Sequence, residues 1–99
     1  MVTLNEKIVE ARIPLARIAN TDLPLPLTMQ IAPFLAECET VIEKAEAYKA
    51  QEGGEEDLAR YLKGVRDLPR CVIPALPEFR MSYVDLKRLD GIVTFEEVG

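Results

Sequence analysis

Four basic side chains recur at intervals of three or four residues in one short segment. They are Arg60, Lys63, Arg66 and Arg70. Because residues three or four apart share one side of a helix, the first three are expected to form a ridge on a helix over residues 55–68. Such a ridge could bind a phosphate group, which indicates a small anionic ligand such as a nucleotide.

The segment before these cations is strongly acidic. Residues 37–57 contain eight carboxylates and two lysines, whereas residues 58–70 contain four cations and one anion. The two segments are therefore expected to face each other across a turn at Gly53 and Gly54. This structural role for the cations is favoured over the ligand site, which stays as the alternative. A third hypothesis is that the acidic segment acts as a decoy that occupies a nucleic-acid-binding protein.

The groups that most often perform catalysis are scarce. The chain contains no histidine, the commonest general base and a frequent metal ligand. Its one serine, Ser82, stands where a helix cap is expected. Cys38 falls on the apolar face of a predicted helix and Cys71 opens a β-like segment, so both are expected to be structural thiols. No catalytic residue, metal site or cofactor is predicted.

The N-terminal segment, residues 1–22, predicts a helix that starts with a capping box at Thr3 and Glu6. Pro14 removes one backbone hydrogen bond and should kink or split this helix. If the helix merely tolerates the proline, Pro14→Ala is expected to stabilise the domain. One apolar face is expected to be buried, with members Leu4, Ile8, Ala11, Leu15 and Ile18.

A second apolar stripe runs along the same predicted helix. Helices of a two-layer domain need one apolar face, so two faces indicate a helix that is covered on both sides. Either the other helices of the chain or a second protein molecule could provide the cover. The stripe contains Val2, Val9, Ile13 and Ala16.

The rest of the chain predicts a connector, two helices and a mixed C-terminal region. Residues 23–27 alternate leucine and proline, which favours an extended connector. A long helix is expected over residues 28–52, with Thr28 as its cap, and the third helix follows at residues 55–68. The region 71–99 should contain a β-like segment, a short helix and a terminal strand that could pair with the β-like segment.

These elements predict one domain of the α+β class that is mostly α. We expect an antiparallel helical hairpin, a third helix and a small C-terminal two-stranded element with one short helix. The net charge of −5 argues against a protein that mainly binds nucleic acid. No apolar run is long enough to cross a membrane, and the N-terminus has no secretory signal, so we expect a cytoplasmic protein without membrane contact.

Three segments carry a resemblance to known proteins. They are Thr3-Leu4-Asn5-Glu6-Lys7-Ile8, Leu23-Pro24-Leu25-Pro26 and Ser82-Tyr83-Val84-Asp85-Leu86-Lys87-Arg88-Leu89. Together with the long charged helix between them, they resemble a group of small phage-encoded proteins of uncharacterised function. The resemblance implies a phage or prophage origin, with the host cytoplasm as location and a role in virion assembly or in interference with the host.

The leading functional hypothesis is a non-enzymatic protein–protein interaction or assembly module that associates with itself. A small domain has a large surface relative to its core, so burying a second surface in an oligomer would stabilise it. The alternative is a nucleotide binder that uses the four cations, or an inhibitor of a host defence protein. The residues predicted to contact a protein partner are Val9, Ile13, Ala16, Leu23 and Leu25.

Overall fold

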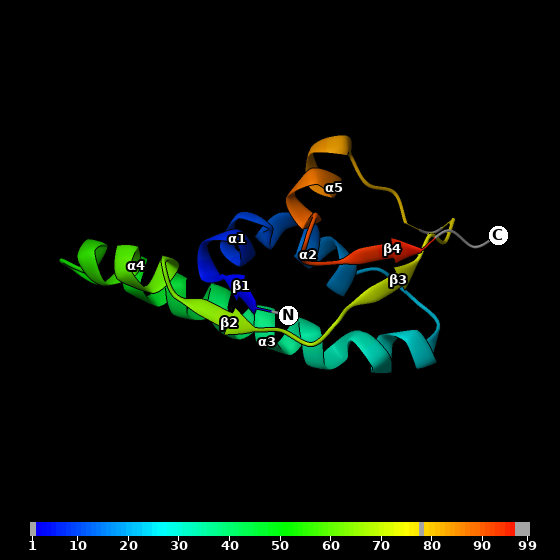
Figure 1. Cartoon of the computed structure of the whole chain (residues 1–99), viewed down its shortest axis with the longest axis horizontal. Helices are drawn as coiled ribbons and strands as arrows, with labels where there is room; N and C mark the ends of the chain where they lie inside the picture. Colours follow the sequence, from blue (N-terminus) through cyan, green and yellow to red (C-terminus); the bar gives the residue numbers. More distant parts are fainter. Residues whose placement is uncertain (1, 78, 97–99) are drawn as a thin grey trace.

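The computed structural model describes residues 2–77 and 79–96, and Figure 1 shows the arrangement of their helices and strands. The described part is elongated, with extents of 50 × 24 × 21 Å. The α+β class with mostly helical content is confirmed. The elements are β1 (Val2–Leu4), α1 (Asn5–Glu10), α2 (Arg12–Ala19), α3 (Leu25–Ala50), α4 (Glu55–Leu62), β2 (Val65–Asp67), β3 (Val72–Pro74), α5 (Tyr83–Leu89) and β4 (Thr94–Glu96).

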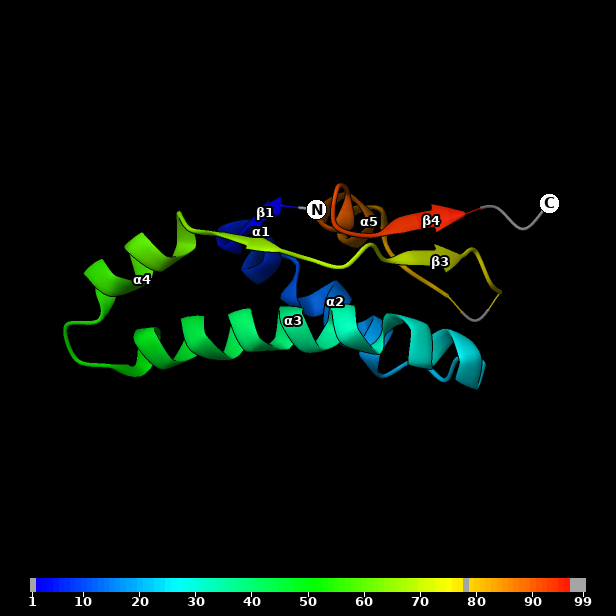
Figure 2. The same cartoon turned by 60° about the horizontal axis from the view of Figure 1, so that its bottom comes forward.

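The long helix α3 forms one side of the molecule, and the other elements pack along it. Figure 2 shows α3 as a nearly straight rod beneath the strands and the shorter helices. Its buried residues recur every three or four positions, which places them on one face. They are Ile31, Phe34, Cys38, Val41 and Ala45. The rest of the core comes from both ends of the chain and includes Ile8, Leu15, Ile18, Leu68, Ile73, Leu89 and Ile92.

The first predicted helix is divided into three elements. Thr3 lies in β1 and is buried, and Leu4 occupies the N-cap position of α1 without a side-chain cap, so the predicted capping box is wrong. The prediction of a split helix is confirmed, and the break falls at Ala11. Pro14 is consequently the third residue of α2, where a backbone amide has no partner in the helix anyway. Leu4 is exposed rather than buried because it belongs to the strand.

The position of Pro14 reverses the expected effect of replacing it. Its ring is fully buried, and the break at Ala11 already accommodates the missing amide. Pro14→Ala should therefore lower the free energy of unfolding by about 2 kcal/mol, because buried methylene groups are lost and the unfolded chain gains freedom. Urea denaturation followed by circular dichroism measures this change. Unfolding at a higher urea concentration in the variant would show that the proline is only tolerated.

The predicted boundary between the connector and the long helix is wrong by three residues. Helix α3 begins at Leu25, after Pro24 in an extended conformation, and Pro26 lies in its first turn. Proline is tolerated there because its amide would be unpaired in any case. Thr28 is inside the helix, and its hydroxyl donates a hydrogen bond to the Pro24 carbonyl rather than capping the first turn.

The third predicted helix is shorter than expected. Helix α4 ends at Leu62, and the chain then pairs with the N-terminus instead of continuing to residue 68. Asn5 fixes this end, because its side-chain amide donates to the Tyr61 carbonyl at 2.9 Å and its backbone amide donates to the Gly64 carbonyl at 2.9 Å. Strand β2 runs antiparallel to β1, and Val65, which falls within the predicted helix 55–68, is exposed on this strand opposite Leu4.

Helices α3 and α4 form the antiparallel helical hairpin of the fold. The turn between them contains Gly53 and Gly54, as predicted. Across the hairpin, the rings of Tyr48 and Tyr61 lie 5.6 Å apart between centroids, and the Lys44 ammonium lies 5.2 Å from the Tyr61 ring. Aromatic and cation–π contacts therefore hold α4 against the last turns of α3.

The C-terminal region agrees with the prediction. Strands β3 and β4 pair in parallel, so the terminal strand meets the β-like segment. Ser82 caps α5, and its hydroxyl oxygen accepts a hydrogen bond from the Asp85 amide at 3.1 Å. Gly91 follows the helix with a φ of +80°, a conformation that glycine adopts without strain. The prediction of a capped short helix between two paired strands is confirmed.

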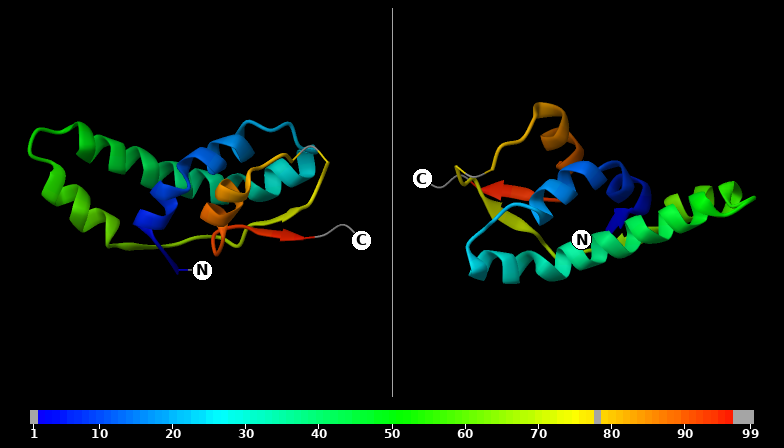
Figure 3. Two further views of the ribbon diagram at one scale, coloured as in Figure 1. Left: turned by 90° about the horizontal axis from the view of Figure 1, so that it is seen from above. Right: turned by 180° about the vertical axis from the view of Figure 1, so that it is seen from behind.

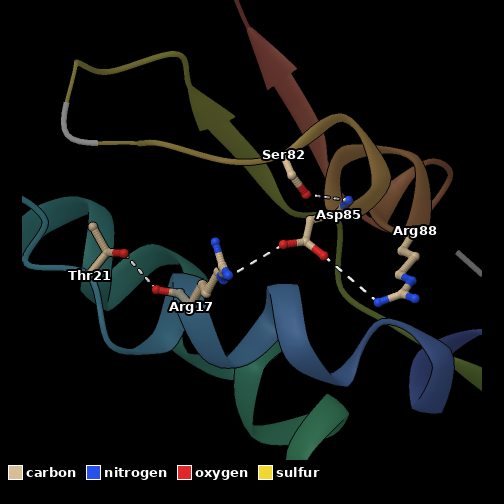
Figure 4. A network of polar contacts seen from close by, with 5 residues as sticks. All are labelled: Arg17, Thr21, Ser82, Asp85 and Arg88. Carbon is tan, nitrogen blue, oxygen red and sulfur yellow. Dashed lines mark hydrogen bonds and ion pairs between the residues drawn. The ribbon is translucent and has the colours of Figure 1, made fainter.

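A buried carboxylate joins α5 to α2. Figure 4 shows Asp85 between two arginines from these helices. Its carboxylate lies 3.6 Å from the Arg17 guanidinium and 3.8 Å from that of Arg88. Two cations neutralise one nearly buried anion, which lowers the cost of removing it from water. The contact holds α5 against α2, which also lies beside α3.

Candidate protein-binding groove

A hollow in the described part lies between α2 and α3. Its volume is about 710 Å³. Figure 3 shows how the connector after α2 returns the chain so that α2 lies beside α3. We call this hollow the α2–α3 groove. It is lined by Arg12, Ile13, Leu15, Ala16, Arg17, Ala19 and Asn20 of the α2 side and by Leu35, Cys38, Glu39, Ile42, Glu43 and Glu46 of α3.

The bottom and inner walls of the groove are apolar. Leu15 and Cys38 line the groove and are buried in the core. Leu35 and Ile42 are partly buried and lie seven residues apart, which places them on one side of α3, two turns from each other. Ile13 on the α2 wall is 48% exposed. The groove thus presents apolar surface that no part of the described chain covers.

The two rims of the groove have opposite charges. Glu39, Glu43 and Glu46 form the α3 rim at spacings of four and three residues, so all three project along one edge of the helix. Arg12 and Arg17 form the α2 rim. Arg17 is engaged by Asp85, and Arg12 donates a hydrogen bond to the Val9 carbonyl at 3.2 Å. Within residues 2–77 and 79–96, no ion pair joins one rim to the other.

The residues predicted to contact a protein partner fall into two groups. Ile13 and Ala16 line the groove. Val9 and Leu23 are partly buried against the core, and Leu25 is 69% exposed at the start of α3, outside the groove. The α3 wall was absent from the prediction. Its signal in the sequence was the seven-residue spacing of Leu35 and Ile42 beside a regular series of glutamates.

The first three of the four predicted cations, Arg60, Lys63 and Arg66, do not form the expected ridge on one helix. Arg60 lies on α4, 3.8 Å from Asp57 of the same helix, and is largely exposed. Lys63 follows the end of α4, Arg66 lies on β2 and Arg70 lies between β2 and β3, because the helix ends at Leu62. The ridge prediction was wrong since it assumed a helix through residue 68.

The expectation that the two charged segments face each other is confirmed at one place. The Arg66 Nε atom donates to the Glu37 Oε2 atom at 2.5 Å, which links β2 to α3. Both side chains are partly exposed, so the pair orients the strand and contributes little net stability. Arg66 is thereby held by a carboxylate of its own chain.

A smaller hollow of about 300 Å³ lies beside α4 and includes one of the predicted cations, Arg60. Asp57 lines it as well, which balances the charge of Arg60. The Asn5 Oδ1 atom and the Tyr61 hydroxyl are buried near it without a hydrogen-bond partner in the described part. Ordered water commonly satisfies such atoms. This hollow therefore favours water or a small neutral polar group over an anion.

The surroundings of Cys38, Cys71 and Ser82, the side chains considered as nucleophiles, favour structural roles for them. Cys38 and Cys71 are both buried. Burial raises the pKa of the Cys38 thiol from 9.0 to about 12, with a smaller contribution from the nearby Cys71, and burial raises the pKa of Cys71 to about 11. The thiolate is the reactive form, so both groups are poor nucleophiles at neutral pH. The Ser82 hydroxyl is used as a helix cap.

In the described residues, no group of three or more His, Cys, Asp or Glu side chains could hold a metal ion. None of the helices found there has the length and apolar character needed to span a bilayer. A comparison of the chain with protein families, curated proteins and solved structures finds no match.

Proposed function

We propose that this chain is a non-enzymatic protein–protein interaction module and that the α2–α3 groove binds an amphipathic helix of its partner. The observation that carries the proposal is an uncovered apolar groove between two helices, with one acidic and one basic rim. Amphipathic helices bind in such grooves through apolar side chains spaced by three, four or seven residues. Leu35 and Ile42 on one wall, with Ile13 on the other, provide the apolar surface that such side chains would contact.

The rims define the chemistry of the helix that would fit. The three glutamates of the α3 rim favour cations along one flank of the bound helix. The α2 rim, with Arg12, tolerates a carboxylate or a polar residue on the other flank. The bound helix should therefore be apolar on its buried face and mainly basic at its edge.

Two further parts of the proposal concern catalysis and origin. The environments of Ser82, Cys38 and Cys71 favour structural roles for these residues and thus a non-enzymatic chain. The resemblance to small phage-encoded proteins supports a phage origin, with virion assembly or interference with the host as the purpose of binding. Nucleotide binding gains no support from the cations, because Arg66 and Arg60 lie next to carboxylates of their own chain.

The proposal is tested with a synthetic helix and a matched pair of variants. The probe is a fluorescent helical peptide with leucines at positions i, i+3, i+4 and i+7 and lysines along one flank. Fluorescence anisotropy at nanomolar probe concentration should show binding to the chain that weakens with added salt. Ile13→Glu should weaken binding at least tenfold, because a charge would enter the apolar groove. Leu25→Glu, the same change on an exposed leucine outside the groove, should bind like the unchanged protein.

Two results would contradict the proposal. One is that the peptide does not bind at protein concentrations at which the chain is a monomer and its groove is free. The other is that both glutamate variants reduce binding equally, which would indicate a general effect of added negative charge. A thermal-shift measurement with mono-, di- and cyclic nucleotides tests the alternative function, and stabilisation lost in Arg60→Glu/Lys63→Glu/Arg66→Glu would favour that alternative.

A further inference from the structure

The chain itself carries a helix with the properties that the groove requires. Helix α2, with the sequence RIPLARIA, contains two arginines and no carboxylate. Its side away from the core presents Ile13 and Ala16, both exposed, between Arg12 and Arg17. This surface is apolar in the middle and basic at its edges.

The surface of α3 on the other wall has the complementary character. Leu35 and Ile42 provide apolar area, and the glutamates of the α3 rim border it. In the part of the chain that the structure describes, Glu39, Glu43 and Glu46 make no ion pair. Three carboxylates on successive turns of one helix repel each other, so a cationic partner surface would stabilise them.

We propose that a second copy of this chain occupies the α2–α3 groove, an inference that rests on the proposed function. In this dimer, α2 of each copy packs on α3 of the other around a two-fold axis. Four helices then surround the apolar side chains, in the order α2, α3, partner α2 and partner α3. Each helix has neighbours of opposite charge, and helices of like charge lie across the diagonals.

A two-fold axis closes this assembly at two copies of the chain. The basic and acidic rims belong to the same groove, so one rotation satisfies both rims of both copies and leaves no open end. A stable interface buries about 800 Å² on each partner. That area is roughly one eighth of the 6794 Å² surface of the chain, so the interface extends beyond the groove onto the outer surfaces of α2 and α3.

The first test measures mass in solution. Sedimentation velocity is measured at protein concentrations from about 1 to about 200 µM. At the highest concentrations it should show a dimer of the 11.1 kDa chain. Ile13→Glu should raise the dimer dissociation constant at least tenfold and keep the circular dichroism spectrum. Leu25→Glu should remain dimeric with the same constant as the unchanged protein.

The second test exchanges charges between the two rims. Arg12→Glu alone and Glu39→Arg/Glu43→Arg alone should each weaken self-association, because like charges would then face each other. Equimolar mixing of these two variants should restore a mixed dimer, since each reversed rim meets a rim of opposite sign. Added salt should reduce this preference for the mixed dimer. Arg17 is left unchanged because it neutralises Asp85.

The possible outcomes separate this inference from the proposed function. A monomer at all concentrations that still binds the synthetic helix would overturn the dimer and leave the groove as a site for another protein. A monomer that does not bind the helix would overturn both. A dimer that is insensitive to Ile13→Glu, or variants that fail to recover on mixing, would place the contact elsewhere and overturn the inference.

Discussion

Raising the pH from 9 to 11 is expected to lower the free energy of unfolding by about 2 kcal/mol for each pH unit, through Cys38 and Cys71 alone. Below pH 9 both thiols are neutral in the folded and the unfolded chain, and their contribution is fully retained. Above pH 9 the unfolded chain loses these protons, whereas burial keeps the folded thiols neutral until their raised pKa values of about 12 and 11. The unfolded state is therefore increasingly favoured.

Urea denaturation at about pH 8.0, 9.5 and 10.5 measures this decrease in the free energy of unfolding. The control is Cys38→Ala/Cys71→Ala, which removes both thiols and leaves every other side chain unchanged. The variant should start less stable, because it lacks two buried sulfur atoms, and should have a shallower dependence on pH. Equal slopes in the two proteins would show that the thiols are accessible to water in the folded state.

Gly54→Ala is expected to destabilise the α3–α4 hairpin by roughly 3 kcal/mol, at the upper end of the cost of overpacking. A β-carbon at this position would lie 2.1 Å from the Tyr48 carbonyl oxygen and 3.0 Å from the Gln51 β-carbon. The first of these atoms belongs to the backbone, so the last turn of α3 must move. Gly54 also occupies the N-cap position of α4, and the movement would be transmitted to the contact between Tyr48 and Tyr61.

Gly53→Ala is the matched control for this change. Gly53 has a φ of +74°, but a β-carbon there would meet no atom within 4 Å. The expected cost is about 1 kcal/mol from the left-handed conformation. Urea denaturation gives the stability of each variant, and hydrogen exchange of the α4 amides shows whether the hairpin opens locally. Equal costs for the two substitutions would mean that the turn can relax around the added methyl group.

Local patterns in the sequence determined several elements of the fold. The three- and four-residue spacing of Ile31, Phe34 and Cys38 established the buried face of α3, because helical periodicity alone selects that face. Ser82 and Gly91 defined the two ends of α5 through capping and a left-handed turn, which depend only on neighbouring residues. These features were predictable since each rests on interactions within one or two turns of chain.

Contacts between distant segments determined the features of the fold for which the sequence-based prediction was wrong. Residues 65–67 leave the helical pattern because pairing with β1 and the hydrogen bonds from Asn5 to Tyr61 and Gly64 are available only in the folded chain. The same pairing removes Thr3 from its predicted cap and separates Arg66 from Arg60. Helix propensity differs by less than about 1 kcal/mol between most residues, so such long-range contacts readily override it.

The groove shows the same division between sequence and tertiary structure. The stripe with Ile13 and Ala16 was visible in the sequence, and it indicated a surface that required cover. The opposite wall, Leu35 and Ile42 with their acidic rim, joined it only through the return of the chain after α2 and the attachment of α2 to α5 by Asp85. Periodicity identifies the faces of single helices, whereas the packing of one helix on another determines which faces meet across a groove.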